Sequence, residues 1–303
     1  MNKELFTKQL KERLEEITEC KVKVNSVDKN NGVKLTALSI MQEGLNVAPV
    51  IYVEPYYELY DSGETFESII EKIMEYEEDY IIEQNFDLDS FLDFSKVKEK
   101  LRYKIVNTEK NIEILKHIPH KDFLDLSKVY YVEVYNTEIG TGTILVSNEH
   151  MKQWGVDWEE LDRMATEQTE KNNLPCVINM KNFSIGILEK LGIEISVESM
   201  WVLLMLPITM VVFTNQRKHL GANVILYKDV LKDYATETNE DLYILPSSTH
   251  EVIVIPDSLA QYQGIKGLKE MVKHVNEIQV EPEEFLSDNV YFYDRQMDNI
   301  KIV

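Results

Sequence analysis

The chain has 303 residues, a length that accommodates two domains, and its 53 Asp and Glu residues against 32 Lys and Arg residues give a formal net charge of −21. This charge excludes a general binder of the nucleic-acid backbone, because such proteins cluster Lys and Arg to displace counterions. It also argues against binding to an anionic membrane surface. What remains is a charge that keeps the protein soluble, attracts a basic partner, or imitates nucleic acid.

The cysteines and the apolar segments indicate where the protein works. Cys20 and Cys176 form no C-x-x-C pair, which is typical of a chain in a reducing compartment. The charged N-terminus has no apolar signal-peptide centre, and the longest apolar run, Met200–Phe213, is shorter than the roughly 20 residues that span a bilayer. We therefore expect a cytoplasmic protein that does not enter a membrane.

The N-terminal third predicts one α+β module. Apolar residues at helical spacing indicate a first helix over residues 1–18. Alternating apolar residues on both sides of Asp28–Gly32 indicate a β-hairpin, because an Asn-Gly pair favours a tight turn. A third strand over residues 48–55 and a helix from Thr65 to Ile82 follow. We predict a helix–three strands–helix module over residues 1–95.

The helix expected from Thr65 to Ile82 is acidic on one face. Its outer row consists of Glu67, Glu71, Glu75 and Glu78. Carboxylates four residues apart on a helix repel each other by a few tenths of a kcal/mol per pair. The helix therefore either uses its charge to bind a basic protein partner or presents an ordinary solvated face.

A group of tyrosines precedes this acidic helix. Its members are Tyr52, Tyr56, Tyr57 and Tyr60, and the last three are the candidate partner contacts. Tyrosine is favoured at protein interfaces because it is rigid and amphipathic, and it also packs at the edges of cores. The group is thus either part of the partner-binding surface or part of the module's core.

Residues 96–303 predict a larger α+β domain. Two segments, Val129–Trp154 and Ile208–Tyr234, share one plan of β-rich run, polar turn with glycine, second β-rich run and short helix. A hairpin over Asp241–Pro256, an amphipathic helix and a late strand at residues 289–295, expected at a sheet edge, complete the chain. The fold class is α+β, with predominantly antiparallel sheets flanked by helices, and with hairpin-helix units in the second half of a two-part chain.

Ser248, His250 and Glu251 form the one candidate catalytic group. Nucleophilic catalysis would need the imidazole within hydrogen-bond reach of the Ser248 hydroxyl. The segment has no G-x-S-x-G elbow, and Pro246 followed by hydroxyl residues is also good turn chemistry. The group is thus either a hydrolase site or a structural turn, and we favour the turn.

The sequence predicts neither a metal site nor a cofactor site. Val254 stands where H-E-x-x-H needs its second histidine, and the other histidines lack metal-ligand spacing. Gly140–Thr143 has no lysine of a phosphate-binding loop, and a strand rather than a helix is expected to follow it. We expect no metal and no cofactor.

Three segments together resemble one bacterial family. They are GTGTILVSNEHMKQWGVDWEEL, VVFTNQRKHLGANVILYKDVL and LYILPSSTHEVIVIPD. They are similar to an uncharacterised family of anaerobic Firmicutes, catalogued as domain of unknown function 5688, and the resemblance covers nearly the whole chain. It implies a bacterial cytoplasmic protein, often encoded on or near a mobile element. Since the family has no accepted activity, the resemblance implies no catalytic residue.

We therefore interpret the chain as a non-enzymatic, acidic protein-interaction or regulatory protein. Its acidic helix is expected to meet a basic protein partner, with nucleic-acid mimicry by a mobile-element protein as a special case. Direct binding to nucleic acid is not expected. The alternatives are a hydrolase that uses Ser248, His250 and Glu251, and a small-molecule-binding module.

Overall fold

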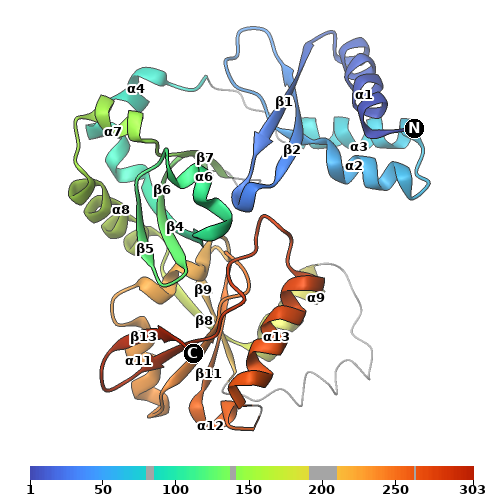
Figure 1. Ribbon diagram of the computed structural model, residues 1–303. Coiled ribbons are helices and arrows are strands. Elements are labelled where there is room, and N and C mark those ends of the chain that lie inside the picture. Colours follow the sequence, from blue (N-terminus) through green and yellow to red (C-terminus); the bar gives the residue numbers. More distant parts are fainter. Residues whose placement is uncertain (80–84, 137–140, 191–209, 263) are drawn as a thin grey trace. The chain divides into compact units, whose positions relative to one another are not determined.

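The computed structural model describes residues 1–79, 85–136, 141–190, 210–262 and 264–303 (Figure 1). The chain divides into two compact units: unit 1 is Met1–Asp93 with Glu133–Thr143, and unit 2 is Phe94–Val132 with Ile144–Val303. The predicted domain boundary between residues 95 and 96 stays a prediction. Gly140, most of the apolar run at residues 200–213 and the predicted end of the acidic helix lie outside the described residues.

Unit 1 contains helices on a small sheet. In chain order its elements are α1 (Lys3–Thr18), β1 (Lys21–Asp28), η1 (Asn30–Gly32), β2 (Lys34–Met41), β3 (Ile51–Tyr52), α2 (Val53–Asp61), α3 (Phe66–Asp79) and α4 (Leu88–Leu92). The sheet order is β1-β2-β3, and β1 and β2 form the predicted antiparallel hairpin. The apolar sides of α1, β2 and α3 share one core, to which they contribute the buried Leu10, Leu38 and Ile73.

The third strand is shorter than the sequence predicts. Only Ile51–Tyr52 is extended, and the Tyr-rich segment after it forms α2. Tyr52 is the N-cap of this helix, so Pro55 falls in its first turn, where a missing N–H removes no intrahelical hydrogen bond. The tyrosines therefore lie on a helix.

The elements from Phe94 to Asn172 form a four-stranded sheet with helices around it, in which Glu133–Asn136 of β6 and Thr141–Thr143 of β7 belong to unit 1 and the rest to unit 2. In chain order they are α5 (Phe94–Val97), η2 (Lys98–Lys100), β4 (Leu101–Asn107), η3 (Glu109–Asn111), α6 (Ile112–Leu115), β5 (His120–Phe123), β6 (Leu126–Asn136), β7 (Thr141–Leu145), α7 (Asn148–Trp154) and α8 (Trp158–Asn172). The order is β4-β6-β5, with β7 also paired to β6. Helix α8 packs along β4.

The second half of unit 2 is a six-stranded sheet of order β13-β12-β10-β11-β9-β8. Its elements are β8 (Pro175–Asn179), α9 (Met180–Lys190), β9 (Val211–Asn215), η4 (Gly221–Leu226), α11 (Val230–Thr238), β10 (Leu242–Leu245), β11 (Val252–Pro256), α12 (Asp257–Ala260), α13 (Gly264–Gln279), β12 (Tyr291–Asp294) and β13 (Asn299–Ile302). The neighbours in this sheet pair antiparallel. The predicted α+β class with predominantly antiparallel sheets is confirmed.

Two details of the second half differ from the sequence prediction. Val129–Trp154 forms the expected hairpin and helix, but Ile208–Tyr234 has the 3₁₀ helix η4 in place of its second strand. Leu220, just before η4, is in the left-handed region with φ 51°, which an extended strand does not allow. The late strand β12 pairs with both β10 and β13, so it is an interior strand and not the edge.

Among the described residues, no helix is both long and apolar enough to cross a bilayer.

The two helices on either side of residue 156 have the cap residues that helix ends favour: Gly155 ends α7 with φ 67°, and Asp157 caps α8 by accepting a hydrogen bond from the Glu160 amide at 2.8 Å.

Candidate functional site

The connection between β10 and β11 is tied to two other segments of unit 2. The Thr249 amide donates to the Glu284 carbonyl at 2.8 Å, and the Thr249 carbonyl accepts from the Ala222 amide at 3.2 Å. Ser248 forms an isolated antiparallel bridge with Phe285. Ser248 and Thr249 are both buried. The predicted catalytic segment is therefore a packed junction and not a free loop.

Ser248 and His250 meet through the main chain. The Ser248 hydroxyl accepts a hydrogen bond from the backbone amide of His250 at 3.0 Å. The imidazole Nδ1 accepts from the Leu220 amide at 3.0 Å, and Nε2 lies 3.1 Å from Oε1 of Glu284. Because Nδ1 is an acceptor, the neutral ring carries its proton on Nε2 and donates it to Glu284. This is the geometry of a turn whose histidine joins two neighbouring loops.

Glu251 completes the predicted group from inside the junction. Burial raises the pKa of its carboxyl, against the opposing effects of the His250 side chain and a hydrogen bond with Ser248. Ser248 thus serves a main-chain amide and a half-buried carboxyl. The catalytic roles of Ser248, His250 and Glu251 stay predictions.

The loop before η4 places a second histidine against His250. The rings of His219 and His250 lie 5.1 Å apart with an interplanar angle of 38°. The fully buried Asn215 holds this loop: its Nδ2 donates to the His219 carbonyl at 2.8 Å, and its Oδ1 accepts from the Arg217 amide at 3.0 Å. Lys218 is left-handed, with φ 52°. A loop held in such a conformation depends on its surroundings to keep it.

The surroundings of His219 disfavour its charged form. Burial of the ring, the nearby His250 and the Lys104 ammonium together lower the pKa of His219 below its ordinary value, while Glu284 acts in the opposite sense. His219 is not among the residues that the sequence predicts for the site, because its neighbour His250 is distant along the chain. Within the described ranges, no three His, Cys, Asp or Glu residues are placed to hold a metal ion.

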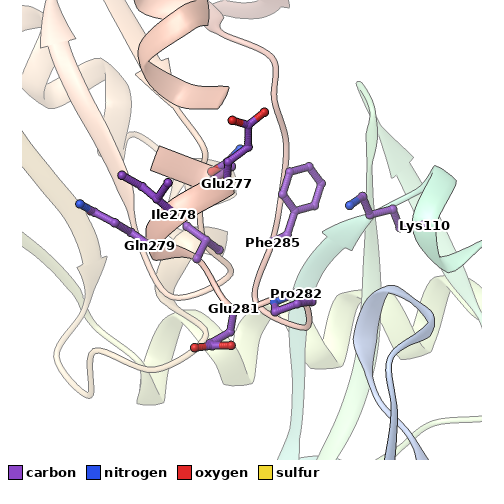
Figure 2. A pocket seen from close by; sticks show the side chains of 9 residues that line it. Lys110, Glu277, Ile278, Gln279, Glu281, Pro282 and Phe285 are labelled. Atoms are coloured by element: carbon purple, nitrogen blue, oxygen red, sulfur yellow. The ribbon is translucent and has the colours of Figure 1, made fainter. Parts of the chain in front are cut away.

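A pocket lies next to the junction in unit 2. It has a volume of about 460 Å³ and is lined by the last turn of α13, by the segment after it and by Lys110. Figure 2 shows Phe285 between Lys110 on one side and the α13 residues, among them Glu277, on the other, and the Lys110 ammonium lies 3.9 Å from the centroid of the Phe285 ring. Since Phe285 is also the bridge partner of Ser248, the junction fixes one wall of this pocket.

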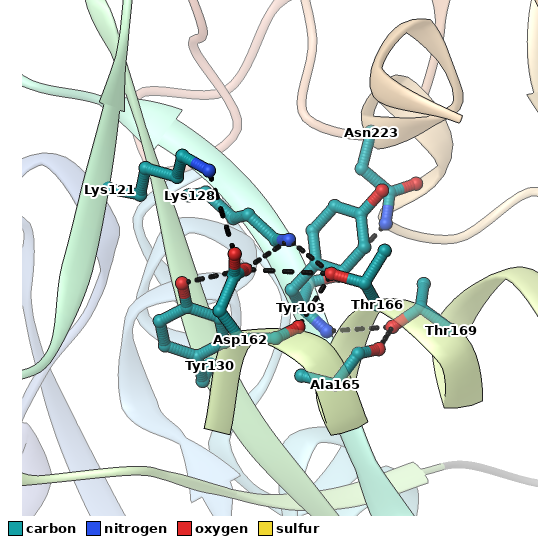
Figure 3. Close-up of polar contacts among 9 residues, drawn as sticks. All are labelled: Tyr103, Lys121, Lys128, Tyr130, Asp162, Ala165, Thr166, Thr169 and Asn223. Atoms are coloured by element: carbon teal, nitrogen blue, oxygen red, sulfur yellow. Dashed lines mark hydrogen bonds and ion pairs between the residues drawn. The ribbon is translucent and has the colours of Figure 1, made fainter. Parts of the chain in front are cut away.

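A buried lysine and its partners brace α8 against the four-stranded sheet (Figure 3). Nζ of Lys128 lies 2.5 Å from Oδ1 of Asp162 and 2.6 Å from the Thr166 hydroxyl. The Tyr130 hydroxyl donates to the same carboxylate oxygen at 3.0 Å, and the Lys128 ammonium stands 4.0 Å from the centroid of the Tyr103 ring. The ammonium is therefore surrounded by acceptors and an aromatic face.

Burial and pairing act against each other in this cluster. Burial lowers the pKa of Lys128 below its ordinary value, and the Asp162 carboxylate opposes that shift. Burial also acts to raise the pKa of Asp162, but its bonds and charge interaction with Lys128 outweigh burial and lower it. The short contact identifies the two as an ion pair with satisfied partners, which is the arrangement of a structural brace. Sequence periodicity did not reveal it.

The four predicted glutamates form an exposed row on α3. Glu67, Glu71, Glu75 and Glu78 are exposed, whereas Ile69, Ile70 and Ile73 of the same helix are buried in the core of unit 1. Only the first of the four lies near a cation among the described ion pairs, with Oε2 of Glu67 4.0 Å from Nε of Arg13. The last turn of α3 has no basic residue. The row is thus a line of glutamates three or four residues apart, which corresponds to a rise of about 4.5–6 Å along the helix axis from one to the next.

The tyrosines pack mainly within unit 1. The rings of Tyr57 and Tyr60 lie 5.4 and 5.2 Å from that of Phe6, and the Tyr57 hydroxyl donates to the Met1 carbonyl at 3.0 Å. Tyr56 is also partly buried against this core. Their share in binding a partner stays a prediction.

Comparison with known proteins places the chain in a family. No curated protein and no solved structure matches it. One family model does match, over residues 3–295 of the 303, and it covers both units, the junction and the α3 row. The chain therefore belongs to the family of unknown function DUF5688.

Proposed function

We propose that this protein is a non-enzymatic interaction protein that binds a basic protein partner through the carboxylate row of α3. The row's regular spacing on one exposed helix face supports the proposal. Lys and Arg side chains on a partner would pair with successive carboxylates, which steers association and fixes register more than it adds affinity. A partner that ordinarily binds nucleic acid would then be open to competition by DNA.

The row lowers the stability of the helix that carries it. Like charges at i,i+3 and i,i+4 repel, and acids near the helix C-terminus oppose the macrodipole. Among the described residues, Lys72 pairs with Glu64 at 2.7 Å instead of with the row. A basic partner would supply the positive charges that relieve this repulsion and that the helix's own sequence does not provide.

We place this activity in the cytoplasm. Cys20 and Cys176 are both free thiols, which supports a reducing environment. Ser248 bonds to main chain and to Glu251, and the His250 ring nitrogens are both engaged. These contacts favour the turn over the hydrolase alternative.

The test is a titration with a decalysine peptide at several salt concentrations. Amidation of the row (Glu67, Glu71, Glu75 and Glu78→Gln) should weaken binding about tenfold, because each exposed ion pair contributes a few tenths of a kcal/mol. The matched control amidates four exposed acids of unit 2, Glu109, Glu159, Asp233 and Glu237. Equal losses in both variants would mean that net charge alone attracts the peptide, and the proposal would fail.

A further inference from the structure

Three buried oxygen atoms of unit 2 have no hydrogen-bond partner within the part of the chain that the structure describes. They are Oη of Tyr103, Oδ1 of Asn223 and Oδ1 of Asn173. Tyr103 is fully buried, and only 1% of Asn223 and 3% of Asn173 is exposed. Buried polar groups are nearly always hydrogen-bonded, because leaving one unpaired costs about as much free energy as losing a hydrogen bond. Three such groups therefore require a partner from outside the chain.

The three residues surround the side chain of Tyr227. Nδ2 of Asn223 donates to the Tyr103 carbonyl at 2.8 Å, which fixes the orientation of the amide and leaves Oδ1 as its other end (Figure 3). The Tyr227 ring lies 6.3 Å from the Tyr103 ring, and the Tyr227 hydroxyl donates to the Asn173 carbonyl at 3.1 Å. Burial raises the pKa of Tyr227, and the nearby Asn223 side chain opposes that shift. Strand β4, η4 and the end of α8 thus bring polar groups to one buried place.

The chemistry of these groups favours a small neutral molecule that donates hydrogen bonds. The two amide oxygens can only accept, whereas a tyrosine hydroxyl can donate or accept. Burial raises the pKa of Tyr103 well above its ordinary value, so this hydroxyl stays neutral, and the Glu170 and Asp162 carboxylates act on it in the same direction. An anion is therefore disfavoured. Water both donates and accepts, and it is small enough for a place that the fold almost closes.

We propose that Tyr103, Asn173, Asn223 and Tyr227 form a binding site for an internal water molecule. The water would donate its two protons to the amide oxygens of Asn223 and Asn173 and accept the proton of the Tyr103 hydroxyl. Such a molecule satisfies all three unpaired atoms at once, and a bridging water is nearly as favourable as a direct hydrogen bond.

The bound water would link two layers of unit 2. Tyr103 belongs to β4 of the four-stranded sheet, and Asn223 belongs to η4. In η4 it follows Ala222, whose amide donates to the Thr249 carbonyl of the junction at 3.2 Å. The water therefore helps to hold the helix on which the junction rests. The site does not involve the α3 row, so failure of either proposal leaves the other intact.

The experiment measures the deuteron magnetic relaxation dispersion of water in solutions of the full-length protein. Its amplitude counts the water molecules that stay inside the fold for longer than the protein takes to rotate. Tyr103→Phe and Asn223→Leu should each lower this count by about one, because each removes a polar partner of the water. Tyr130→Phe is the matched control: its hydroxyl bonds to Asp162 instead of to the site, so the count should stay the same.

Thermal unfolding of Tyr103→Phe gives an independent sign. If the hydroxyl bonds to a bound water, its removal should lower Tm by about 2–4 °C. In a dry site the same substitution would remove an unpaired polar group, and Tm would stay the same or rise. The Tyr103 hydroxyl has no partner among the described residues, so this variant should fold even if Asn223→Leu does not.

Two results would overturn the proposal. One is a Tm of Tyr103→Phe that equals or exceeds that of the unaltered protein. The other is a water count that the site variants leave unchanged, or that falls equally in Tyr130→Phe, since the lost water would then not belong to this site.

Discussion

The Ser248 hydroxyl accepts a hydrogen bond from the backbone amide of His250, 3.0 Å away, while the imidazole of His250 bonds to Leu220 and Glu284. A serine nucleophile needs the opposite arrangement, in which the ring takes the hydroxyl proton. The junction therefore predicts effects on stability and none on ester hydrolysis.

Ser248→Ala should destabilise the protein by about 1–3 kcal/mol, because it leaves a buried amide without an acceptor. Urea denaturation measures this change. The same variant, and the unaltered protein, should show no labelling by a fluorophosphonate probe. Labelling that disappears in Ser248→Ala would instead establish the hydrolase alternative.

The His250–Glu284 pair predicts a pH dependence of stability. The hydrogen bond from His250 lowers the pKa of Glu284, against burial. A carboxyl whose pKa is lower in the folded state adds stability above its unfolded pKa of about 4.3, and this stability is lost as pH falls through the folded value. Glu284→Gln should therefore be less stable than the unaltered protein at pH 6, and the difference should shrink below about pH 4.3.

His219 also makes the folded protein less stable as pH falls. Its pKa is lowered in the folded state, so the unfolded chain binds a proton first as pH falls below about 6.5, and stability declines. The matched variant His219→Gln should flatten the stability profile just below that pH while leaving the Glu284 effect in place. If Glu284→Gln has the same dependence of stability on pH as the unaltered protein, the contact between His250 and Glu284 is contradicted.

A side chain at position 221 is predicted to disturb the packing around Gly221. A Cβ there would lie 2.3 Å from Oγ1 of Thr214 and 2.7 Å from the His250 carbonyl oxygen. Gly221→Ala should therefore destabilise the protein by about 3 kcal/mol or more. Gly186 of α9 has open space at its Cβ position, so Gly186→Ala should be neutral or stabilising by up to about 1 kcal/mol. Equal thermal shifts in the two variants would contradict the described loop.

The Lys128–Asp162 brace predicts non-additive substitutions. Lys128→Met and Asp162→Asn should each destabilise the protein by about 3 kcal/mol, because the first removes the closest cation from the half-buried Asp162 and the second removes the carboxylate from the buried Lys128. The double variant should lose about 1–3 kcal/mol less than the sum, as measured in a double-mutant cycle by urea denaturation. Additive losses would show that the two side chains do not interact.

We predict that the α3 row promotes partner binding but lowers the stability of the folded protein. Amidating Glu67, Glu71, Glu75 and Glu78 removes three neighbouring repulsions and should raise the free energy of unfolding by roughly 1 kcal/mol at low salt. The gain should vanish near 1 M salt, where the screening length is about 3 Å. A loss of stability at low salt would mean that the row is engaged in attractive contacts within the chain.

Short-range features of the fold could be predicted from the sequence. The hairpin around Asp28–Gly32, the buried stripe of α3 and the cap at Asp157 each depend on residues a few positions apart. The predicted strand after Gly221 is instead η4, which follows Leu220 with φ 51°, and the surrounding atoms leave no space for a side chain at Gly221. That constraint comes from β9 and from His250, which no local pattern reveals.

The long-range contacts of the sites could not be predicted. His219 meets His250, and Glu284 meets the same ring, only after the strands of one sheet have assembled. Lys128 stands in a strand, where an isolated lysine usually faces solvent, and its burial depends on Asp162 of α8. By contrast, the acidic row needed only helical periodicity, so its exposed position could be predicted.

The central claim is that the α3 row is the surface that meets a basic partner. Carbodiimide cross-linking of a decalysine peptide to the full-length protein, mapped by mass spectrometry, tests it most directly because the reagent joins carboxylates to amines in contact. If the α3 row is that surface, adducts should concentrate on Glu67, Glu71, Glu75 and Glu78 and should decrease as salt is raised. Adducts spread over the exposed acids of both units in proportion to their number would contradict it.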